Sequence, residues 1–276
     1  MNFSKENDIT FSIITVSFNA FNEIEETIKS VCNQTFRKFE YIVIDGGSFD
    51  GTCDIIEKYS NEIAIYISEK DAGIYDAMNK GISLSRGKFL IFMNAGDKFF
   101  DCSVLSKIVE IESLEQYSLI YGDYLREDHN KLAYRASRDY STIWYGMFAS
   151  HQSMFFRRQV IEPLKYDISL RIGADYDLVA KIICAKHLKI KKINVPICIF
   201  NTSGISNEDW KFALLENFKT RRSILHLNFL FCCLVLVFHA MINLLRVNFP
   251  IIYLNFRQIQ QCGGRILKAF NSKVDG

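Results

Sequence analysis

The chain has 276 residues, of which 49% are hydrophobic, and a formal net charge of +2 at pH 7. This length accommodates one or two domains with a substantial core. No basic stripe runs along it, so it lacks the electrostatic footprint of a nucleic-acid-binding protein and no nucleic-acid partner is expected. The polar N-terminus has no signal-peptide pattern, and eight cysteines without a Cys-x-x-Cys pair indicate reduced residues of a cytoplasmic protein.

The first 115 residues alternate between two periodicities. Short apolar, β-branched runs predict strands, and apolar residues three and four apart predict the helices between them. The predicted strands are Phe11–Ser17, Tyr41–Ile44, Ile63–Ile67 and Phe89–Met93. The predicted helices are Glu23–Cys32, Cys53–Tyr59, Ile74–Ile82 and Val104–Ile111. This alternation indicates right-handed βαβ units around a parallel sheet, an α/β fold.

Polar turns follow three of these strands, and each contains an aspartate. Asp45 begins a glycine-rich turn, Asp71 follows the third strand, and Asp97 closes the stretch Asn94-Ala-Gly-Asp97. Parallel strands bring their carboxyl ends to one edge, where ligands bind. We therefore expect the three aspartates near one another, and clustered acids imply a cation or a basic ligand. The alternative for the last stretch is an ordinary turn in which Asp97 or Asp101 caps the next helix.

The pattern weakens after residue 115. It predicts strands at Leu119–Tyr121, Leu132–Arg135, Met154–Phe156 and Ile193–Phe200, and helices at Asp175–Cys184 and Glu208–Leu225. Because Pro196 has no N–H to donate, we expect strand Ile193–Phe200 at a sheet edge.

The C-terminal part is apolar and basic. From Lys219 onward there are eight lysines and arginines against one acid, and residues 229–242 are almost entirely apolar. This apolar stretch is shorter than the usual span of about 20 residues. It favours a membrane-embedded or interfacial helical segment over a clean transmembrane helix, and the basic residues suit an anionic membrane surface. The alternative is a helix docked on the preceding domain.

The sequence contains no phosphate loop, no Gly-x-Gly-x-x-Gly fingerprint and no serine nucleophile elbow. Aspartates at strand ends instead favour a nucleoside diphosphate held through a divalent metal. Four motifs occur in order: Ser12-Ile-Ile-Thr-Val-Ser-Phe-Asn19, Val43-Ile-Asp-Gly-Gly-Ser-Phe-Asp-Gly-Thr52, Asp71-Ala-Gly-Ile-Tyr-Asp-Ala-Met-Asn-Lys-Gly81 and Asn94-Ala-Gly-Asp97. Together they resemble the family 2 glycosyltransferases of bacterial polysaccharide assembly, strongly over about residues 10–115 and more weakly to about 205.

The resemblance implies a GT-A fold over residues 1–215. Its Rossmann-like nucleotide-binding sheet would occupy about 10–115, and its acceptor-side α/β part about 116–205. Residues 216–276 would add a C-terminal apolar helical segment that associates with the membrane. Residues 203–206 resemble a flexible loop that closes over the donor.

The resemblance also implies roles for single residues. The expected nucleotide-sugar contacts are Thr15, Val16, Ser17, Asn19, Asp45, Asp71, Asn94, Ala95 and Gly96. Asp97 matches the last acid of the family's Asp-x-Asp metal motif, although Asn94 stands where many members have another acid. The implied cofactor is a divalent metal, manganese or magnesium. His151 is a further metal or diphosphate candidate, and the alternative for a lone histidine is a structural role.

Asp175, in Ile172-Gly-Ala-Asp-Tyr-Asp-Leu178, matches the family's general base, although Ala174 replaces the usual glutamate. The alternative is a helix N-cap. The implied activity is inverting transfer of a sugar from a nucleoside-diphosphate sugar to a saccharide hydroxyl. The acceptor is expected to be lipid-linked and at the inner membrane.

Two other functions stay open. One is a catalytically inactive GT-A-like nucleotide-sugar binding module. The other is a sugar nucleotidyltransferase, which needs a glycine-rich basic loop after the first strand, and residues 16–22 contain neither glycine nor lysine nor arginine.

Overall fold

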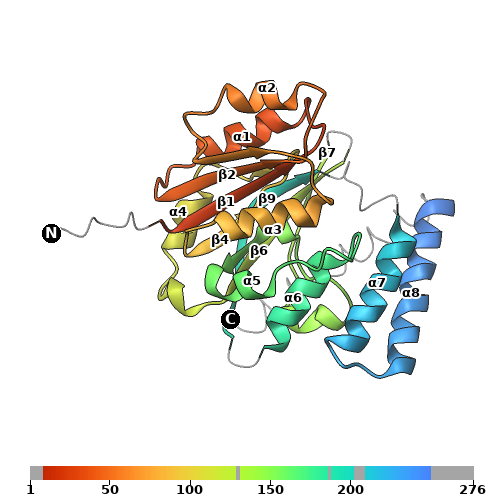
Figure 1. The fold of residues 1–276 in the computed structure, drawn as a ribbon. Coiled ribbons are helices and arrows are strands. Elements are labelled where there is room, and N and C mark those ends of the chain that lie inside the picture. The colour runs from red at the N-terminus through yellow and green to blue at the C-terminus, as the bar shows by residue number, and fades with distance from the viewer. Residues whose placement is uncertain (1–8, 129–130, 186–187, 202–208, 250–276) are drawn as a thin grey trace.

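The computed structural model describes residues 9–128, 131–185, 188–201 and 209–249 of the chain. In this part, one nine-stranded sheet has the order β3-β2-β1-β4-β8-β6-β9-β5, with β7 paired to β6 (Figure 1). The strands are β1 Phe11–Ser17, β2 Phe39–Asp45, β3 Ile65–Ser68, β4 Phe89–Phe92, β5 Lys98–Phe99, β6 Leu119–Asp128, β7 Lys131–Arg135, β8 Met154–Arg157 and β9 Ile190–Asn201. The α-helices are α1 Ile24–Cys32, α2 Thr52–Glu57, α3 Ile74–Leu84, α4 Val104–Val109, α5 Arg158–Leu164, α6 Ala174–Cys184, α7 Trp210–Ser223 and α8 Phe229–Asn248.

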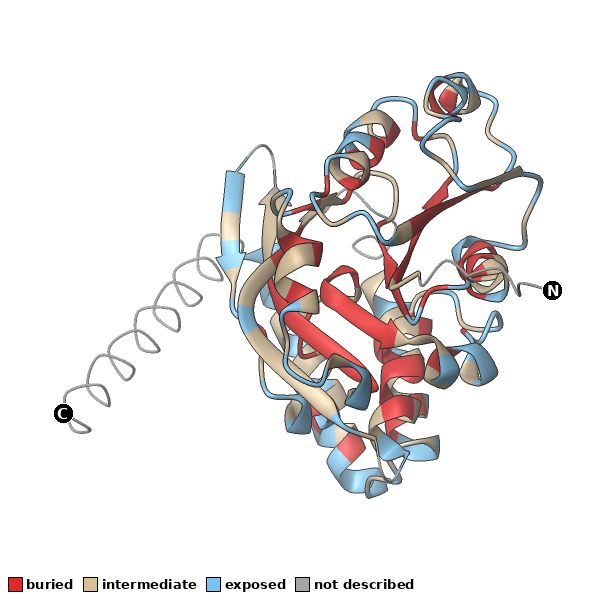
Figure 2. Ribbon diagram, turned by 90° about the vertical axis from the view of Figure 1, so that its left-hand side faces the viewer, coloured by how far each residue is buried: buried red, intermediate tan, exposed pale blue. Residues whose placement is uncertain are grey.

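The N-terminal half of the sheet is parallel, as predicted. β1 pairs in parallel with both β2 and β4, and every residue of β1 is buried (Figure 2). A strand buried on both faces needs apolar residues throughout, which explains its continuous run. β4 then pairs antiparallel with β8, so the sheet changes direction beside the end of β4.

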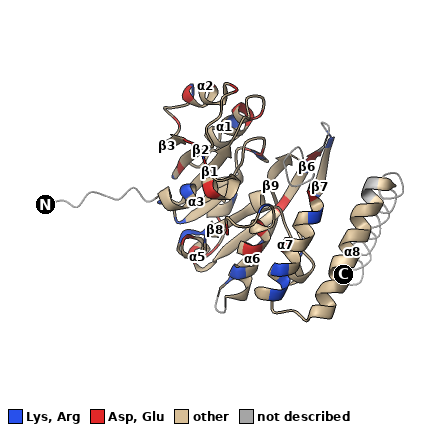
Figure 3. Ribbon diagram, turned by 45° about the vertical axis from the view of Figure 1, so that its right-hand side comes forward, with Lys and Arg blue, Asp and Glu red and all other residues tan. Residues whose placement is uncertain are grey.

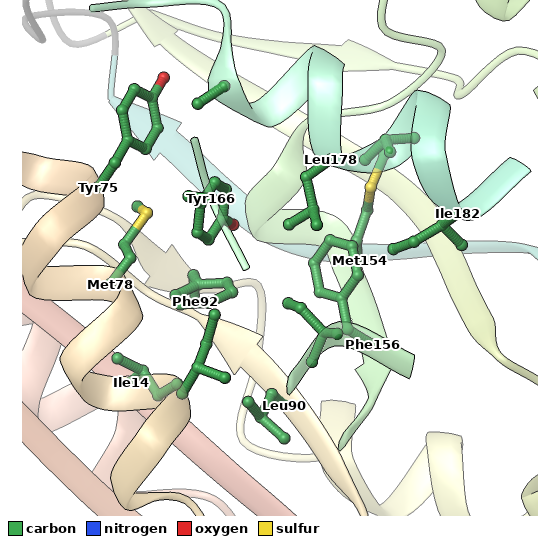
Figure 4. Close-up of a cluster of buried hydrophobic side chains, with 14 of the residues drawn as sticks. Ile14, Tyr75, Met78, Leu90, Phe92, Met154, Phe156, Tyr166, Leu178 and Ile182 are labelled. Carbon is green, nitrogen blue, oxygen red and sulfur yellow. The ribbon is translucent and has the colours of Figure 1, made fainter. Parts of the chain in front are cut away.

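Apolar side chains cover both faces of the sheet. On one face, α1, α2 and α4 pack against residues such as Ile13 and Val43. On the other, Ile14 and Phe92 of the sheet meet Met78 of α3 and Leu178 of α6 (Figure 4). This second cluster joins α3, the end of β4 and α6 into one packed body, which fixes α6 relative to the parallel strands.

The expected edge position of strand Ile193–Phe200 is wrong. The strand, β9, lies between β6 and β5. Pro196 pairs with Asp123 of β6 at an irregularity where the register shifts. A bulge tolerates a residue without an N–H, so the proline does not force its strand to the edge.

α7 and α8 form a helical pair beside the sheet domain (Figure 1). The predicted boundary at residue 215 falls inside α7, and the division into domains stays a prediction. Among the described helices, none is long and apolar enough to cross a membrane. The predicted loop at 203–206 and residues 250–276 of the predicted membrane segment lie outside the described residues.

Candidate functional site

Asp45 lies at the end of β2, where its carboxylate organises the glycine-rich turn that follows. It accepts hydrogen bonds from the hydroxyls of Ser17, Ser48 and Ser68, and from the backbone N–H groups of Gly47 and Ser48, at 2.6–3.0 Å. Burial raises the pKa of Asp45, but the hydrogen bonds from Ser48, Ser68 and Ser17 outweigh burial and lower it below its ordinary value. The carboxylate is therefore ionised and holds the turn in one shape.

The end of β1 supports the same turn. Thr15 is buried and donates to the carbonyl of Met93 at 2.7 Å, so its hydroxyl connects β1 to the end of β4. The side-chain oxygen of Asn19 accepts from the N–H of Phe49, and the N–H of Asn19 donates to Ser48 Oγ. The carbonyl of Val16 accepts from the N–H of Ala95. These predicted contact residues thus join the turns after β1, β2 and β4.

Asp71 lies directly against the turn after β2. A Cβ atom built on Gly46 would lie only 2.7 Å from Asp71 Oδ2 and 3.3 Å from the ring of Phe18. Position 46 therefore accommodates only glycine while Asp71 and Phe18 stay in place. The structure brings Asp71 to the turn that Asp45 organises, as predicted.

Two exposed phenylalanines, Phe18 and Phe49, lie in the turns after β1 and β2, at a corner that they share with Asp71. No role for them was predicted from the sequence. Phe18 is 61% exposed and Phe49 is 83% exposed, and their ring centroids are 6.3 Å apart in an edge-to-face arrangement. Large aromatic side chains left in water beside a carboxylate can stack on a flat ligand. The signal that could have found them is their occurrence inside polar turns, Ser17-Phe-Asn19 and Ser48-Phe-Asp50.

Asp97 forms a second, separate group just beyond β4. Its side chain is buried and accepts hydrogen bonds from Gln152 Nε2 at 2.9 Å and from the N–H of Asn201 at 3.2 Å. Burial raises the pKa of Asp97 to about 7, although His151 and these two donors act in the opposite direction. Asp97 therefore titrates near neutral pH. It does not cap the next helix, because the N-cap of α4 is Ser103 and the Asp97 carboxylate binds Gln152 and Asn201.

His151 connects Asp97 to the predicted general base. His151 Nδ1 lies 3.1 Å from Asp175 Oδ2, and His151 Nε2 lies 3.5 Å from Asn94 Nδ2. Burial lowers the pKa of His151, but the carboxylates of Asp175 and Asp97 outweigh burial and raise it above its ordinary value. The imidazole thus contacts Asp175 directly and is influenced by the nearby charge of Asp97.

Two buried oxygens of this group have no hydrogen-bond partner among the described residues. They are Asn94 Oδ1 and Asp175 Oδ1. A buried polar atom without a partner carries an energetic cost, and a catalytic role or a bound ion is one explanation for it. Gly96, with φ of +95°, allows the turn that places Asn94 and Asp97 together.

The three aspartates predicted to lie together divide into two groups instead. Asp71 adjoins the turn that Asp45 organises, whereas Asp97 contacts Gln152 and Asn201. In the described part of the chain, no group of three or more His, Cys, Asp or Glu side chains could hold a metal ion. The strand ends do meet at one edge, but burial directs Asp45 and Asp97 to different partners.

Asp175 and Asp177 have different surroundings on the first turn of α6. Gly173 is the N-cap of this helix, and Asp175 turns toward His151 and is not a cap. Asp177 is buried; it pairs with Lys181, one turn later on α6, at 2.5 Å, and lies 3.4 Å from Thr220 Oγ1 of α7. Only Asp175 therefore faces the group at the end of β4.

Known proteins share this sequence pattern and this fold. The model of Glycosyl transferase family 2 matches residues 12–174. A PGL/p-HBAD biosynthesis glycosyltransferase of Mycobacterium tuberculosis is 29% identical over 203 residues, 71% of this chain and 79% of that protein.

Two solved structures are similar in fold. Staphylococcus aureus TarS 1–349 in complex with UDP-GlcNAc has a TM-score of 0.63 at 16% identity, covering 82% of this chain and 70% of that one. A mannosyltransferase from Pyrobaculum calidifontis, in complex with GDP-Man and Mn2+, has a TM-score of 0.59 at 15% identity, covering 91% and 79%. The chain belongs to glycosyl transferase family 2 and is a glycosyltransferase with the GT-A fold.

Proposed function

We propose that the protein is an inverting glycosyltransferase. It moves a sugar from a nucleoside-diphosphate sugar to a hydroxyl of a lipid-linked saccharide in cell-surface polysaccharide synthesis. The observation that supports this most directly is the position of Asp175. One of its oxygens is held by His151, and the other is buried with no hydrogen-bond partner in the described part of the chain.

The donor nucleotide is proposed to bind at the corner formed by Phe18, Phe49 and Asp71. An aromatic platform can stack on a base, and a carboxylate can accept from the N–H or hydroxyl groups of a nucleoside. The structural neighbours bind UDP-GlcNAc and GDP-Man. The diphosphate would then extend toward Asn94 and Asp97, because the turns after β1 and β4 are hydrogen-bonded to each other.

A divalent cation fits this second group only in company with the diphosphate. Asp97 offers one carboxylate, and Asn94 offers an unpartnered amide oxygen. Magnesium is commonly held by one or two carboxylates together with substrate phosphates, so this small donor set suffices. When bound, manganese or magnesium would neutralise charge on the leaving diphosphate. His151 already faces Asp175 and Asn94, so we assign it to holding Asp175.

The proposed transfer is a direct displacement. Asp175 Oδ1 accepts the proton of the acceptor hydroxyl while the hydroxyl oxygen bonds to the anomeric carbon. The bond from that carbon to the diphosphate oxygen breaks on the opposite side, which inverts the anomeric configuration. His151 Nδ1 holds Asp175 Oδ2 throughout, so Asp175 Oδ1 stays directed to the acceptor.

The acceptor is proposed to reach the protein at an anionic membrane surface, with the protein peripheral or monotopic at the cytoplasmic face of the inner membrane. The outward face of α8 is apolar, and Leu234 and Val237 are each 62% exposed. Trp144 lies against Phe231 of α8 at 5.5 Å. Exposed Lys219 and Arg222 at the end of α7 add positive charge (Figure 3). Apolar and aromatic side chains beside basic ones suit the headgroup region.

The donor site can be tested by binding alone. We expect UDP, GDP or their sugar conjugates to raise Tm in the presence of Mn2+ or Mg2+, because a ligand of the folded state stabilises it. Phe18→Ala should weaken binding of the active nucleotide by about ten- to hundredfold, since stacking on one base is worth about 1–3 kcal/mol. The exposed Phe100→Ala is the matched control and should bind normally. An absence of any shift across the panel, with either metal, would contradict the proposed donor site.

The membrane surface can be tested by vesicle flotation of the full chain. We expect binding to phosphatidylglycerol vesicles that falls at least tenfold in Leu234→Gln/Val237→Gln, because each exposed aliphatic side chain gains about 1.5–3 kcal/mol on full burial. Leu132→Gln, an exposed leucine on β7, is the control and should leave binding unchanged. Equal vesicle binding by the α8 variant, or none by the wild type, would rule out this surface.

A further inference from the structure

Helix α6 begins without a capping side chain of its own. Its N-cap is Gly173, which has no side chain to cap the helix. The backbone just before the helix is instead bound by a side chain of α7. Glu216 accepts hydrogen bonds from three successive backbone N–H groups, those of Arg171 at 2.8 Å, Ile172 at 3.0 Å and Gly173 at 2.7 Å. A single carboxylate thus binds the backbone that leads into α6.

The contact between these two segments is close. A Cβ atom built on Gly173 would lie 2.9 Å from Cβ of Glu216. Arg171 adds an ion pair of 2.7 Å with Asp209, just before α7. On the opposite side, the hydroxyl of Tyr75 donates to the carbonyl of Ile172 at 2.5 Å. The start of α6 is therefore held between α3 and α7.

Asp175 depends on this support because its own side chain has little. Its Oδ2 contacts His151, and its Oδ1 has no hydrogen-bond partner among the residues that the structure describes. With one polar contact from these residues, the side chain follows any movement of its backbone. Glu216 binds the backbone at Gly173, two residues before Asp175. A displacement of about 1 Å at a reacting group can cost 10²-fold in rate.

We propose that Glu216 is a positioning residue for the transfer reaction: its carboxylate, bound to the N–H groups of Arg171, Ile172 and Gly173, sets where Asp175 stands relative to His151. The proposal rests on the role of Asp175 in the proposed function. It gives α7, which lies outside the residues matched by the family model, a direct effect on the reaction centre.

The test measures the contact between His151 and Asp175 by NMR, from the imidazole ¹⁵N signals of His151 in the full chain at fixed pH. Asp175→Asn supplies the signal expected when the contact with the carboxylate is lost. We expect Glu216→Ala and Glu216→Gln to move the His151 signal toward that position. Glutamine keeps one acceptor oxygen for these N–H groups and alanine keeps none, so Glu216→Gln should shift the signal less than Glu216→Ala. Glu162→Gln, which removes an exposed charge paired with Arg158 on α5, is the matched control and should change nothing.

Kinetic and binding measurements distinguish a misplaced Asp175 from a smaller fraction of folded protein. We expect Glu216→Gln to lower kcat about tenfold while the Kd for UDP or GDP with Mn2+ stays within twofold and the binding stoichiometry stays at one. In the Asp175→Asn background the same substitution should have no further effect, because the positioned group is gone.

A folded Glu216→Gln protein with an unchanged His151 signal and unchanged kcat would overturn the proposal. The proposal would also be overturned if Glu216→Gln lowered kcat by the same factor in the Asp175→Asn background as in the wild type. If Asp175→Asn itself leaves turnover intact, the proposed function fails, and the His151 signals still decide whether Glu216 positions Asp175.

Discussion

Asp175→Asn is expected to lower kcat for sugar transfer by about 10²–10⁴-fold, the usual contribution of a general base. Asparagine keeps the size of the side chain but cannot take a proton from the acceptor hydroxyl. Binding of the donor nucleotide should change little, because Asp175 faces His151 and not the corner of Phe18 and Asp71. The measurement is release of the nucleoside diphosphate from the donor found by the binding panel, with a membrane lipid extract as acceptor.

Asp177→Asn is the matched control for that result. Asp177 lies on the same helical turn but is buried against Lys181 and Thr220. Removing its charge should lower Tm and leave kcat within a few-fold. Turnover by Asp175→Asn close to that of the wild type, or equal losses in the two variants, would show that Asp175 is not the base.

The parallel half of the fold could be predicted from sequence because its signals are local. Strands β1 and β2 are apolar runs buried on both faces, and the apolar positions of α1 and α3 follow helical spacing. The other half of the sheet, in which β6 and β9 are parallel and the remaining pairs antiparallel, was less predictable. β5 has two residues and pairs with β9 far along the chain, so no local pattern marks it.

The candidate site was also predictable only where the signals are local. The motifs locate the turns with Asp45, Asp71 and Asp97, but they do not tell which carboxylate becomes buried among hydroxyl donors and which remains beside a ligand position. The pairing of His151 with Asp175 joins a short 3₁₀ turn to a helix start, and only the packing of α6 on β4 brings them together.

Glu216 was not predictable for a related reason. Its partners are backbone N–H groups, which every residue except proline has, so the sequence around Arg171–Gly173 contains no complementary side chain. Gly173 was the available signal, because the side chain of Glu216 lies so close that a Cβ atom at position 173 would collide with it. Hydrogen bonds from a side chain to backbone groups far away in the sequence thus leave no sequence pattern, and they become visible only in the structure.

Asp97→Asn is expected to have opposite effects on stability and on ligand binding. The folded-state pKa of Asp97 is about 7, above its ordinary value of 3.8, because the carboxyl group is buried. A raised pKa means that the folded protein favours the protonated form. This stabilisation is fully present below pH 3.8 and is lost as the pH rises through 7. At pH 8 the free protein therefore holds a buried carboxylate, at a cost of about 4 kcal/mol relative to acid pH.

Asparagine at position 97 has no charge to bury, so the part of the pH dependence of stability that Asp97 causes should be absent from the variant. At pH 8 its Tm should exceed that of the wild type by several degrees, since about 1 kcal/mol corresponds to about 2–4 °C in a protein of this size. At pH 5 the difference between the two Tm values should be smaller than at pH 8, because less of the stabilisation by the protonated carboxyl group has been lost. Asp101→Asn is a control of opposite sign. Burial raises the pKa of Asp101, but Lys107 and Ser103 outweigh burial and lower it, so this variant should not gain stability at pH 8.

The same substitution should remove the effect of the metal. In the wild type at pH 8, a cation bound with the diphosphate compensates the Asp97 carboxylate, so Mn2+ with UDP or GDP should raise Tm more at pH 8 than at pH 6. In Asp97→Asn this pH-dependent gain should disappear, and calorimetry should show nucleotide affinity that no longer depends on Mn2+. Unchanged Mn2+-dependent binding in the variant would show that the cation is held elsewhere. A variant less stable than the wild type at pH 8 would show that the Asp97 carboxylate stabilises the free protein.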